Sequence, residues 1–110
     1  MFSSELKKGS TEMLVLSLVE TRARHGYEIG KLIEARSNGR LTFALPTLYP
    51  ALLRLENRGW IKGRWVEKPG ERQRCFYRLT PEGRRVLAEQ RENWQAYVLA
   101  VNQVMDGSDA

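Results

Sequence analysis

Four side chains that could hold an anion fall within one short stretch of the sequence. Hydroxyl and guanidinium groups of this kind bind phosphate or carboxylate oxygens. The four residues are Thr47, Tyr49, Arg54 and Arg58. Binding is favoured over catalysis, because the sequence shows no paired His and carboxylate, no metal-ligand spacing and no phosphate-cradling glycine loop. On this stretch alone, a plain core helix with a polar outer face explains them equally well.

The same stretch predicts the helix that positions these side chains. Its apolar residues recur at i, i+4 and i+7, which is typical of a helix with one buried face; they are Leu48, Leu52 and Leu55. We expect Thr47 to cap the helix, with Pro50 in its first turn, and an alternative start lies at Pro46. Gly59 suits the left-handed residue after the helix, with Trp60 packing back on the last leucine.

After Gly59 the period of the pattern changes from helical to alternating. Residues 60–66 and 74–79 predict two strands, and residues 68–71 read Lys-Pro-Gly-Glu, which suits a type II turn. Residues 60–80 hold six Lys or Arg against two Glu. The cations near the tip are Lys68, Arg72 and Arg74. A basic hairpin directly after such a helix is the wing of a winged helix, and the alternative is a plain solvated ribbon.

Two further helices are expected before the first stretch. The predicted order is a helix over 11–20, a turn over 21–26, a helix over 27–35 and a loop over 37–44. The first helix is apolar on nearly every side, so it is expected to be central, with Ser10 or Thr11 near its start. The second and third helices give a helix-turn-helix layout.

The C-terminal residues predict one long helix. Thr80 is the expected N-cap and Pro81 the first helical residue. An apolar seam follows at spacings of four, three and four, widened by Tyr97 and Val104; it comprises Trp94, Val98, Val101 and Met105. A small core cannot cover this helix along its whole length, so the seam needs a partner, most simply a second copy of the chain.

Composition bounds the remaining possibilities. The chain has 110 residues, 42% hydrophobic and 28% charged, with net charge +5, which fits a single folded domain with a preference for anions. No apolar run is long enough to cross a bilayer, no secretory signal is expected because residues 1–8 lack an apolar stretch, and the one cysteine fits a reducing cytoplasm. His25 is expected to cap a helix or face solvent. Cys75 is expected to be a small core residue, with a redox role as the alternative.

In order and spacing, several pieces of the sequence resemble the PadR family of transcriptional regulators. The pieces are residues 26–29 (Gly-Tyr-Glu-Ile), 47–52 (Thr-Leu-Tyr-Pro-Ala-Leu), 54–56 (Arg-Leu-Glu), 59–61 (Gly-Trp-Ile) and 77–83 (Tyr-Arg-Leu-Thr-Pro-Glu-Gly). The resemblance implies a winged-helix homodimer that represses transcription at a roughly palindromic operator. Within this family, the sequence is similar to the short branch with a single C-terminal helix. In that branch an aromatic residue of the last helix can line a cavity between subunits, which implicates Trp94.

The fold class expected is α+β, mostly α: a winged helix-turn-helix over residues 1–80 and a long C-terminal dimerisation helix over 81–110, forming one compact unit. We expect a sequence-specific regulator of double-stranded DNA with an inverted-repeat operator, a repressor released by a small aromatic or apolar ligand. The alternative is a winged-helix module for protein–protein contact. No catalytic residue, cofactor or metal is expected. The predicted DNA-binding residues are Thr47, Tyr49, Arg54, Lys68, Arg72 and Arg74; the predicted ligand-binding residues are Trp94, Tyr97 and Val98; the predicted dimerisation residues are Trp94, Val98, Val101 and Met105.

Overall fold

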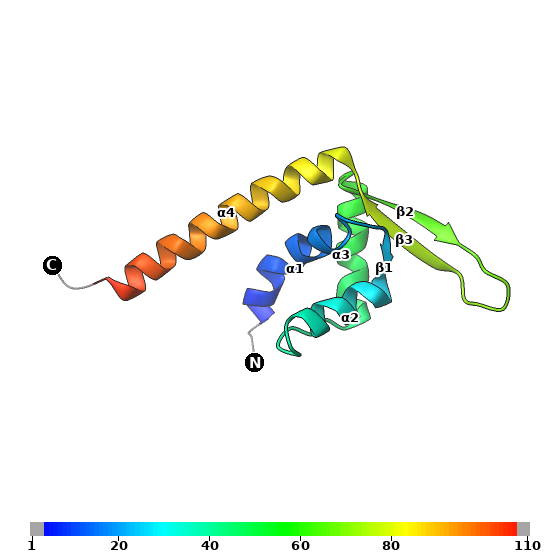
Figure 1. Ribbon diagram of the computed structural model, residues 1–110, viewed down its shortest axis with the longest axis horizontal. Coiled ribbons are helices and arrows are strands. Elements are labelled where there is room, and N and C mark those ends of the chain that lie inside the picture. The colour runs from blue at the N-terminus through cyan, green and yellow to red at the C-terminus, as the bar shows by residue number, and fades with distance from the viewer. Residues whose placement is uncertain (1–3, 108–110) are drawn as a thin grey trace.

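Three helices and a small sheet form the body of the molecule, from which two long elements project. The computed structural model describes residues 4–107, apart from the side chains of residues 4–6 and 8. The helices are α1 (Ser4–Leu18), α2 (Gly26–Arg36), α3 (Leu45–Asn57) and α4 (Pro81–Asp106), and the strands are β1 (Arg24–His25), β2 (Ile61–Val66) and β3 (Arg74–Leu79). Figure 1 shows α4 leaving the body on one side and the β2–β3 hairpin on the other, which gives extents of 67 × 31 × 21 Å.

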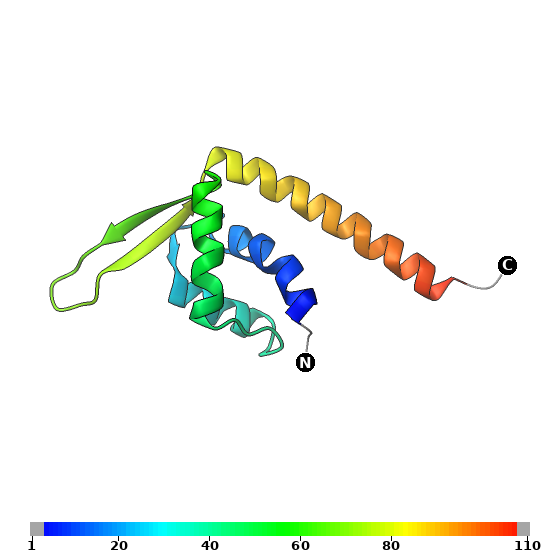
Figure 2. The same cartoon turned by 180° about the vertical axis from the view of Figure 1, so that it is seen from behind.

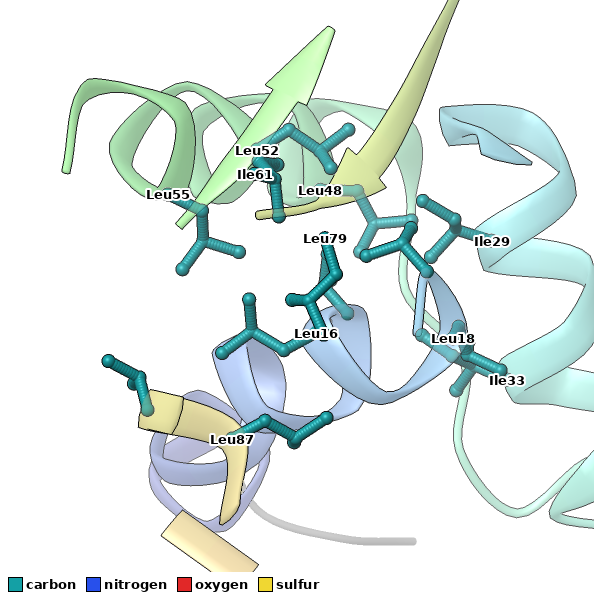
Figure 3. Close-up of a cluster of buried hydrophobic side chains, with 13 residues drawn as sticks. Leu16, Leu18, Ile29, Ile33, Leu48, Leu52, Leu55, Ile61, Leu79 and Leu87 are labelled. Carbon is teal, nitrogen blue, oxygen red and sulfur yellow. The ribbon is translucent and has the colours of Figure 1, made fainter. Parts of the chain in front are cut away.

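The core lies where α1, α2 and α3 meet the base of the hairpin and the first turns of α4. Figure 3 shows this cluster, in which Leu16 of α1, Leu48 of α3 and Leu87 of α4 are fully buried. The predicted stripe of Leu48, Leu52 and Leu55 is confirmed, since all three side chains are at most 1% exposed. Burial of apolar surface of this kind is the main force that holds the elements together.

The predicted start of α3 was wrong by three residues. Its N-cap is Ala44, and Thr47 lies inside the first turn, where its backbone N–H donates to the Ala44 carbonyl at 2.9 Å. Pro46 explains the shift, because proline is favoured in a first turn whose N–H groups have no helical partner. Pro50 therefore lies inside the helix.

The predicted end of α3 is confirmed. Gly59 has φ +78°, and its N–H donates to the Glu56 carbonyl at 2.9 Å. The N–H of Trp60 donates to the Leu55 carbonyl at 3.1 Å, which completes a Schellman motif. The Trp60 side chain packs against the core, with the Arg58 guanidinium carbon 5.0 Å from the ring centre.

Two predictions about the N-terminal half need correction. Helix α1 begins at Ser4, well before the predicted start, and the Thr11 hydroxyl donates back to the Lys7 carbonyl at 2.7 Å. The predicted turn over 21–26 contains a third strand, in which Arg24 pairs with Tyr77 and His25 with Phe76. Two residues are too few to show an alternating pattern, and the pairing depends on β3, which lies far along the chain.

The sheet is antiparallel with strand order β1-β3-β2, so β3 is the central strand (Figures 1 and 2). In the hairpin, Ile61 pairs with Leu79 and Val66 with Arg74. The predicted turn is present: the Glu71 N–H donates to the Lys68 carbonyl at 3.0 Å, and Gly70 has φ +77°. The hairpin prediction is therefore confirmed.

A joint of hydrogen bonds ties the start of α4 to the end of α3. The Thr80 hydroxyl donates toward the Gly59 carbonyl at 2.6 Å and accepts from the Gly83 N–H at 3.0 Å, which confirms Thr80 as the N-cap. The Thr80 N–H donates to the Trp60 carbonyl at 3.0 Å. A Cβ added at Gly83 would overlap this same Trp60 carbonyl oxygen, so glycine permits the close approach of the two elements.

Candidate nucleic-acid interface

Helix α3 presents a continuous exposed face that sequence reasoning did not single out. Pro46, Pro50, Leu53 and Asn57 recur at spacings of four, three and four, and all four residues are exposed. At 3.6 residues per turn they lie opposite the buried leucines. The spacing itself was the signal that could have found them, had it been applied to the outer face as well as to the core face.

The predicted reading residues of α3 lie on the two flanks of this face. Tyr49 lies on the flank toward the hairpin, in a groove of about 520 Å³ that Leu53 and Trp65 also line. Thr47 and Arg54 lie on the other flank, in a groove of about 520 Å³ beside α1. The structure therefore does not bring Thr47 and Tyr49 together, although each borders the outward face.

Tyr49 is held against the start of α2. A Cβ added at Gly26 would lie 3.0 Å from the Tyr49 ring, so the absence of a side chain at Gly26 makes room for that ring. Tyr49 remains 51% exposed, and its neighbour across the groove, Trp65, is 65% exposed. Trp65 points to the same side of the hairpin as Ile61, as predicted, but it lies beyond the core. The groove thus exposes aromatic surface next to the outward face.

Arg54 is engaged by a carboxylate of α1. Its Nε lies 3.3 Å from Glu12 Oε2, and Arg58 Nη1 lies 2.8 Å from Glu12 Oε1. Both arginine side chains are about half exposed, at 52% and 45%, so they can still reach an anion. Glu12 was not predicted, because nothing in its local sequence shows that it faces a helix more than forty residues away.

The predicted wing cations are exposed. Lys68, Arg72 and Arg74 all lie at or near the tip of the hairpin, and no carboxylate of the described residues forms an ion pair with them. Arg74 Nη1 lies 2.9 Å from His25 Nε2, which connects the hairpin to the start of α2. Cations that are not neutralised by a carboxylate are suited to phosphate groups.

His25 caps α2, as predicted. Its Nδ1 accepts from the Glu28 N–H at 3.2 Å. Burial, and then the nearby Arg74 guanidinium, lower the pKa of His25 below its ordinary value. A neutral imidazole has only one acceptor nitrogen, so it accepts either from the Glu28 N–H or from Arg74 at any moment.

The acidic partner in this region is Glu28. Its Oε2 accepts from Arg22 at 2.7 Å and from Arg24 at 2.9 Å. Burial raises the pKa of Glu28, but the hydrogen bonds from these arginines outweigh burial and hold the pKa below its ordinary value. Arg24 also donates to the Leu18 carbonyl at 2.6 Å, so a nearly buried guanidinium fixes the position of the helix-turn-helix relative to α1.

The inner side of the hairpin contains a half-buried pair, Cys75 and Tyr77. Burial and the neighbouring Cys75 raise the pKa of the Tyr77 hydroxyl well above its ordinary value. A Cβ added at Gly63 would lie 2.6 Å from Cys75 Sγ and 3.1 Å from a Glu56 carboxylate oxygen. Glu56 in turn accepts from the Gly63 N–H at 3.0 Å. Cys75 therefore packs where α3 is joined to the hairpin.

The predicted apolar seam of α4 is partly exposed to solvent. Trp94 is 45% exposed and Met105 is 70% exposed, whereas Val98 and Val101 are half-buried. Toward its start the helix contacts α1, where Arg91 donates to the Ser17 hydroxyl at 3.1 Å, and Arg91 also donates to Glu20, just after α1, at 2.9 Å. Three residues back from Trp94 the seam position is Arg91, and the ion pair with Glu20 explains why that position is polar.

A groove of about 310 Å³ lies between α1 and α4. Two of the predicted ligand-binding residues, Trp94 and Tyr97, line it together with Glu12 and Met13. Gln90 also lines the groove, and its Oε1 is buried with no hydrogen-bond partner among the described residues. Val98, the third predicted residue, does not line this groove.

Two absences hold for residues 4–107. No helix there combines the length and the hydrophobicity that crossing a membrane requires. No three His, Cys, Asp or Glu of those residues are grouped so that they could hold a metal ion.

A helix-turn-helix followed by a basic hairpin defines the winged-helix class of proteins. Comparison with known proteins identifies the family. The model of the transcriptional regulator PadR-like family matches residues 15–89, so the chain belongs to this family. Several solved relatives are described as transcriptional regulators, and the fold of this chain is that of a DNA-binding regulator.

Individual relatives agree with this assignment. A transcriptional regulator from Clostridium thermocellum is 32% identical, with a TM-score of 0.86 over 94% of this chain and 97% of that one. A PadR family regulator from Eggerthella lenta is 32% identical, with a TM-score of 0.85 over 94% of this chain and 88% of that one. An uncharacterized protein of Lysinibacillus sphaericus is 28% identical over 107 residues, which is 97% of this chain and 98% of the relative.

Proposed function

We propose that the chain is a cytoplasmic, homodimeric repressor that binds an inverted-repeat operator and is released by a small aromatic or apolar ligand. In this proposal residues 1–80 form the DNA-reading unit, and the region 81–110 contributes the dimerisation helix α4 (Pro81–Asp106). Helix α3 enters the major groove, and the hairpin cations contact phosphates. Two copies joined through α4 would read half-sites about one helical turn (~34 Å) apart.

The uncovered seam of α4 supports the dimer. Met105 is 70% exposed and Val104 is 83% exposed, and both belong to one apolar stripe with Trp94. A contiguous apolar surface of this kind is unfavourable in water and marks an interaction site. A second α4 offers the same stripe, so a twofold interface would bury both.

The groove between α1 and α4 supports the proposal that a small ligand binds. Trp94 and Tyr97 offer aromatic surface, and the unpartnered Gln90 oxygen offers an acceptor to a donor group. A flat aromatic compound that carries one hydrogen-bond donor satisfies both features. The alternative is that Trp94 is an ordinary core residue of the dimer interface.

The position of Glu12 carries the proposal that ligand binding changes DNA binding. Glu12 lines the ligand groove and also accepts from Arg54 and Arg58 on α3. A ligand that moves this carboxylate therefore changes two cations of the reading helix. It can shift the equilibrium only by the difference in its affinity for the two arrangements.

Two measurements with the full chain test the proposal. A duplex is first selected from a random library, and its sequence is inspected for inverted symmetry. If about six to eight phosphates are neutralised per dimer, the logarithm of affinity falls with the logarithm of salt at a slope near −5 to −7. An affinity for DNA that is absent at every salt concentration would instead favour the protein–protein module.

Ligand binding is tested with Trp94 as the only fluorophore of its kind, after Trp60→Phe and Trp65→Phe. A panel of flat aromatic compounds is titrated, and each compound is then added to the protein–DNA complex. We expect the compounds that quench Trp94 to release the duplex, and compounds that do not quench it to leave the complex intact. Quenching without release would show that the groove binds ligands but does not regulate the chain.

A further inference from the structure

The outward face of α3 is apolar along most of its length. Pro46, Pro50 and Leu53 are all exposed, with Leu53 at 58%. Neither proline has a backbone N–H, and none of the three side chains has a polar atom. The part of α3 that would face the floor of a groove therefore cannot read base edges by hydrogen bonds until Asn57 is reached.

Charge is arranged on both sides of this apolar strip. On one side Arg72 and Arg74 line the groove that Leu53 and Tyr49 share. On the other side, beside α1, lie Arg54 and Arg58. Cations on two flanks with an apolar strip between them match a DNA major groove, which has a phosphate backbone on either side and base edges on its floor.

The largest apolar group on the floor of the major groove is the 5-methyl group of thymine. We propose that Leu53, with Pro46 and Pro50, is a specificity determinant that reads thymine methyl groups in the half-site. The strip from Pro46 to Leu53 spans about 10 Å at 1.5 Å per residue, which corresponds to about three base-pair steps. The inference rests on the proposed function, because it assumes that α3 lies in the major groove.

Replacing thymine by uracil tests whether α3 contacts thymine methyl groups, because uracil keeps the hydrogen-bonding pattern of the base and lacks only the methyl group. The duplex selected from the random library is resynthesised with deoxyuridine at each half-site thymine in turn. A control duplex carries deoxyuridine only outside the two half-sites. The expected loss is about threefold to fourfold in affinity for each contacted methyl group. The control duplex should bind like the parent.

A variant assigns the effect to the helix face. Leu53→Ala should weaken binding to the thymine duplex. It should also remove most of the difference in affinity between the thymine and uracil duplexes, because the effects of two groups in contact are not additive. Leu99→Ala is the matched control, since Leu99 is 60% exposed on α4. It should keep the full thymine preference. Circular dichroism checks that both variants are folded.

The outcomes separate the two proposals. A protein that prefers its selected duplex over random DNA but binds the uracil version equally well would overturn this inference and leave the proposed function standing. A thymine preference that persists unchanged in Leu53→Ala would also overturn it. A protein that retains no duplex at all would overturn both.

Discussion

Glu12 Oε1 of α1 lies 2.8 Å from Arg58 Nη1 of α3, although 46 residues separate the two along the chain. The other carboxylate oxygen accepts from Arg54, so one acidic residue engages both cations on that flank of α3. Exposed ion pairs such as these contribute only about 0–1 kcal/mol to stability. Their larger effect is on the charge that α3 offers to an anion.

Replacing Glu12 by Gln should increase DNA affinity. The change releases Arg54 and Arg58, so we expect several-fold tighter binding and a salt slope that is steeper by about one for each released arginine that contacts a phosphate. Anisotropy titrations across a salt series measure both. Glu34→Gln is the matched control, since it removes an equal charge from an exposed position on α2. Equal gains in the two variants would show that net charge, and not the release of the arginines, is responsible.

Arg72→Ala and Tyr49→Ala should weaken DNA binding in different ways. Arg72 at the wing tip is expected to contact phosphate, so its loss should lower affinity for all sequences alike and reduce the salt slope by about one for each chain of the dimer. Tyr49 borders the reading face, so its loss should reduce affinity for the selected duplex more than for random DNA. Competition titrations distinguish the two patterns. Wild-type affinity in both variants would contradict the placement of the interface.

Val98→Glu should dissociate the dimer. A carboxylate at this half-buried position of the seam would be buried without a partner in a twofold interface, which is strongly unfavourable. Light scattering across a concentration series gives the mass. Leu99→Glu is the control, because Leu99 lies off the seam on the same helix and is 60% exposed. If both variants keep the wild-type mass, α4 is not the interface.

Stability should fall as the pH drops below about 6.5. The pKa of His25 is lowered in the folded chain, so the unfolded chain binds the proton more readily. The contribution of neutral His25 is thus fully present above the unfolded pKa of about 6.5 and is lost as the pH falls toward the folded pKa. His25→Asn keeps a helix cap that does not titrate. Urea unfolding at several pH values should show a smaller pH dependence in this variant, and an unchanged dependence would assign the effect elsewhere.

Gly83→Ala should destabilise the fold by about 1–3 kcal/mol or more. The added methyl group would overlap the Trp60 carbonyl oxygen, and both elements are fixed by the Thr80 joint. Gly9→Ala is the control, because nothing lies within 4 Å of a Cβ there and a helical alanine should stabilise the chain by about 0.5–1 kcal/mol. Thermal unfolding measures the two changes, which should have opposite signs.

Features set by neighbouring residues could be predicted from the sequence. Each of three predicted roles depends on residues close by in the chain, and each is present: Gly59 with Trp60 ends α3, Pro69 with Gly70 makes the turn, and Thr80 caps α4. The apolar stripe of α3 was predictable for the same reason, since periodicity is a local property.

Features set by distant partners were missed. Strand β1 exists because β3 pairs with it, and Arg54 turns toward Glu12 because α1 packs beside α3. The cap of α3 was misplaced because Thr47 is a better capping residue than Ala44, while Pro46 favours the earlier start. The sequence could not show which residues of α3 lie toward the hairpin and which lie toward α1, because that depends on where these two elements pack.

The hydrogen bonds of the Thr80 joint attach α4 rigidly to the DNA-reading unit. Its 26 residues span about 39 Å, so a rotation of roughly 5° at the joint displaces the far end by about 3 Å. That displacement is close to the rise of one base pair, ~3.4 Å. In a dimer joined through the far ends of α4, a small change in this angle would leave both cores intact. It would nevertheless shift the two DNA-reading units relative to each other by about one base pair, so that they no longer match the spacing of the half-sites.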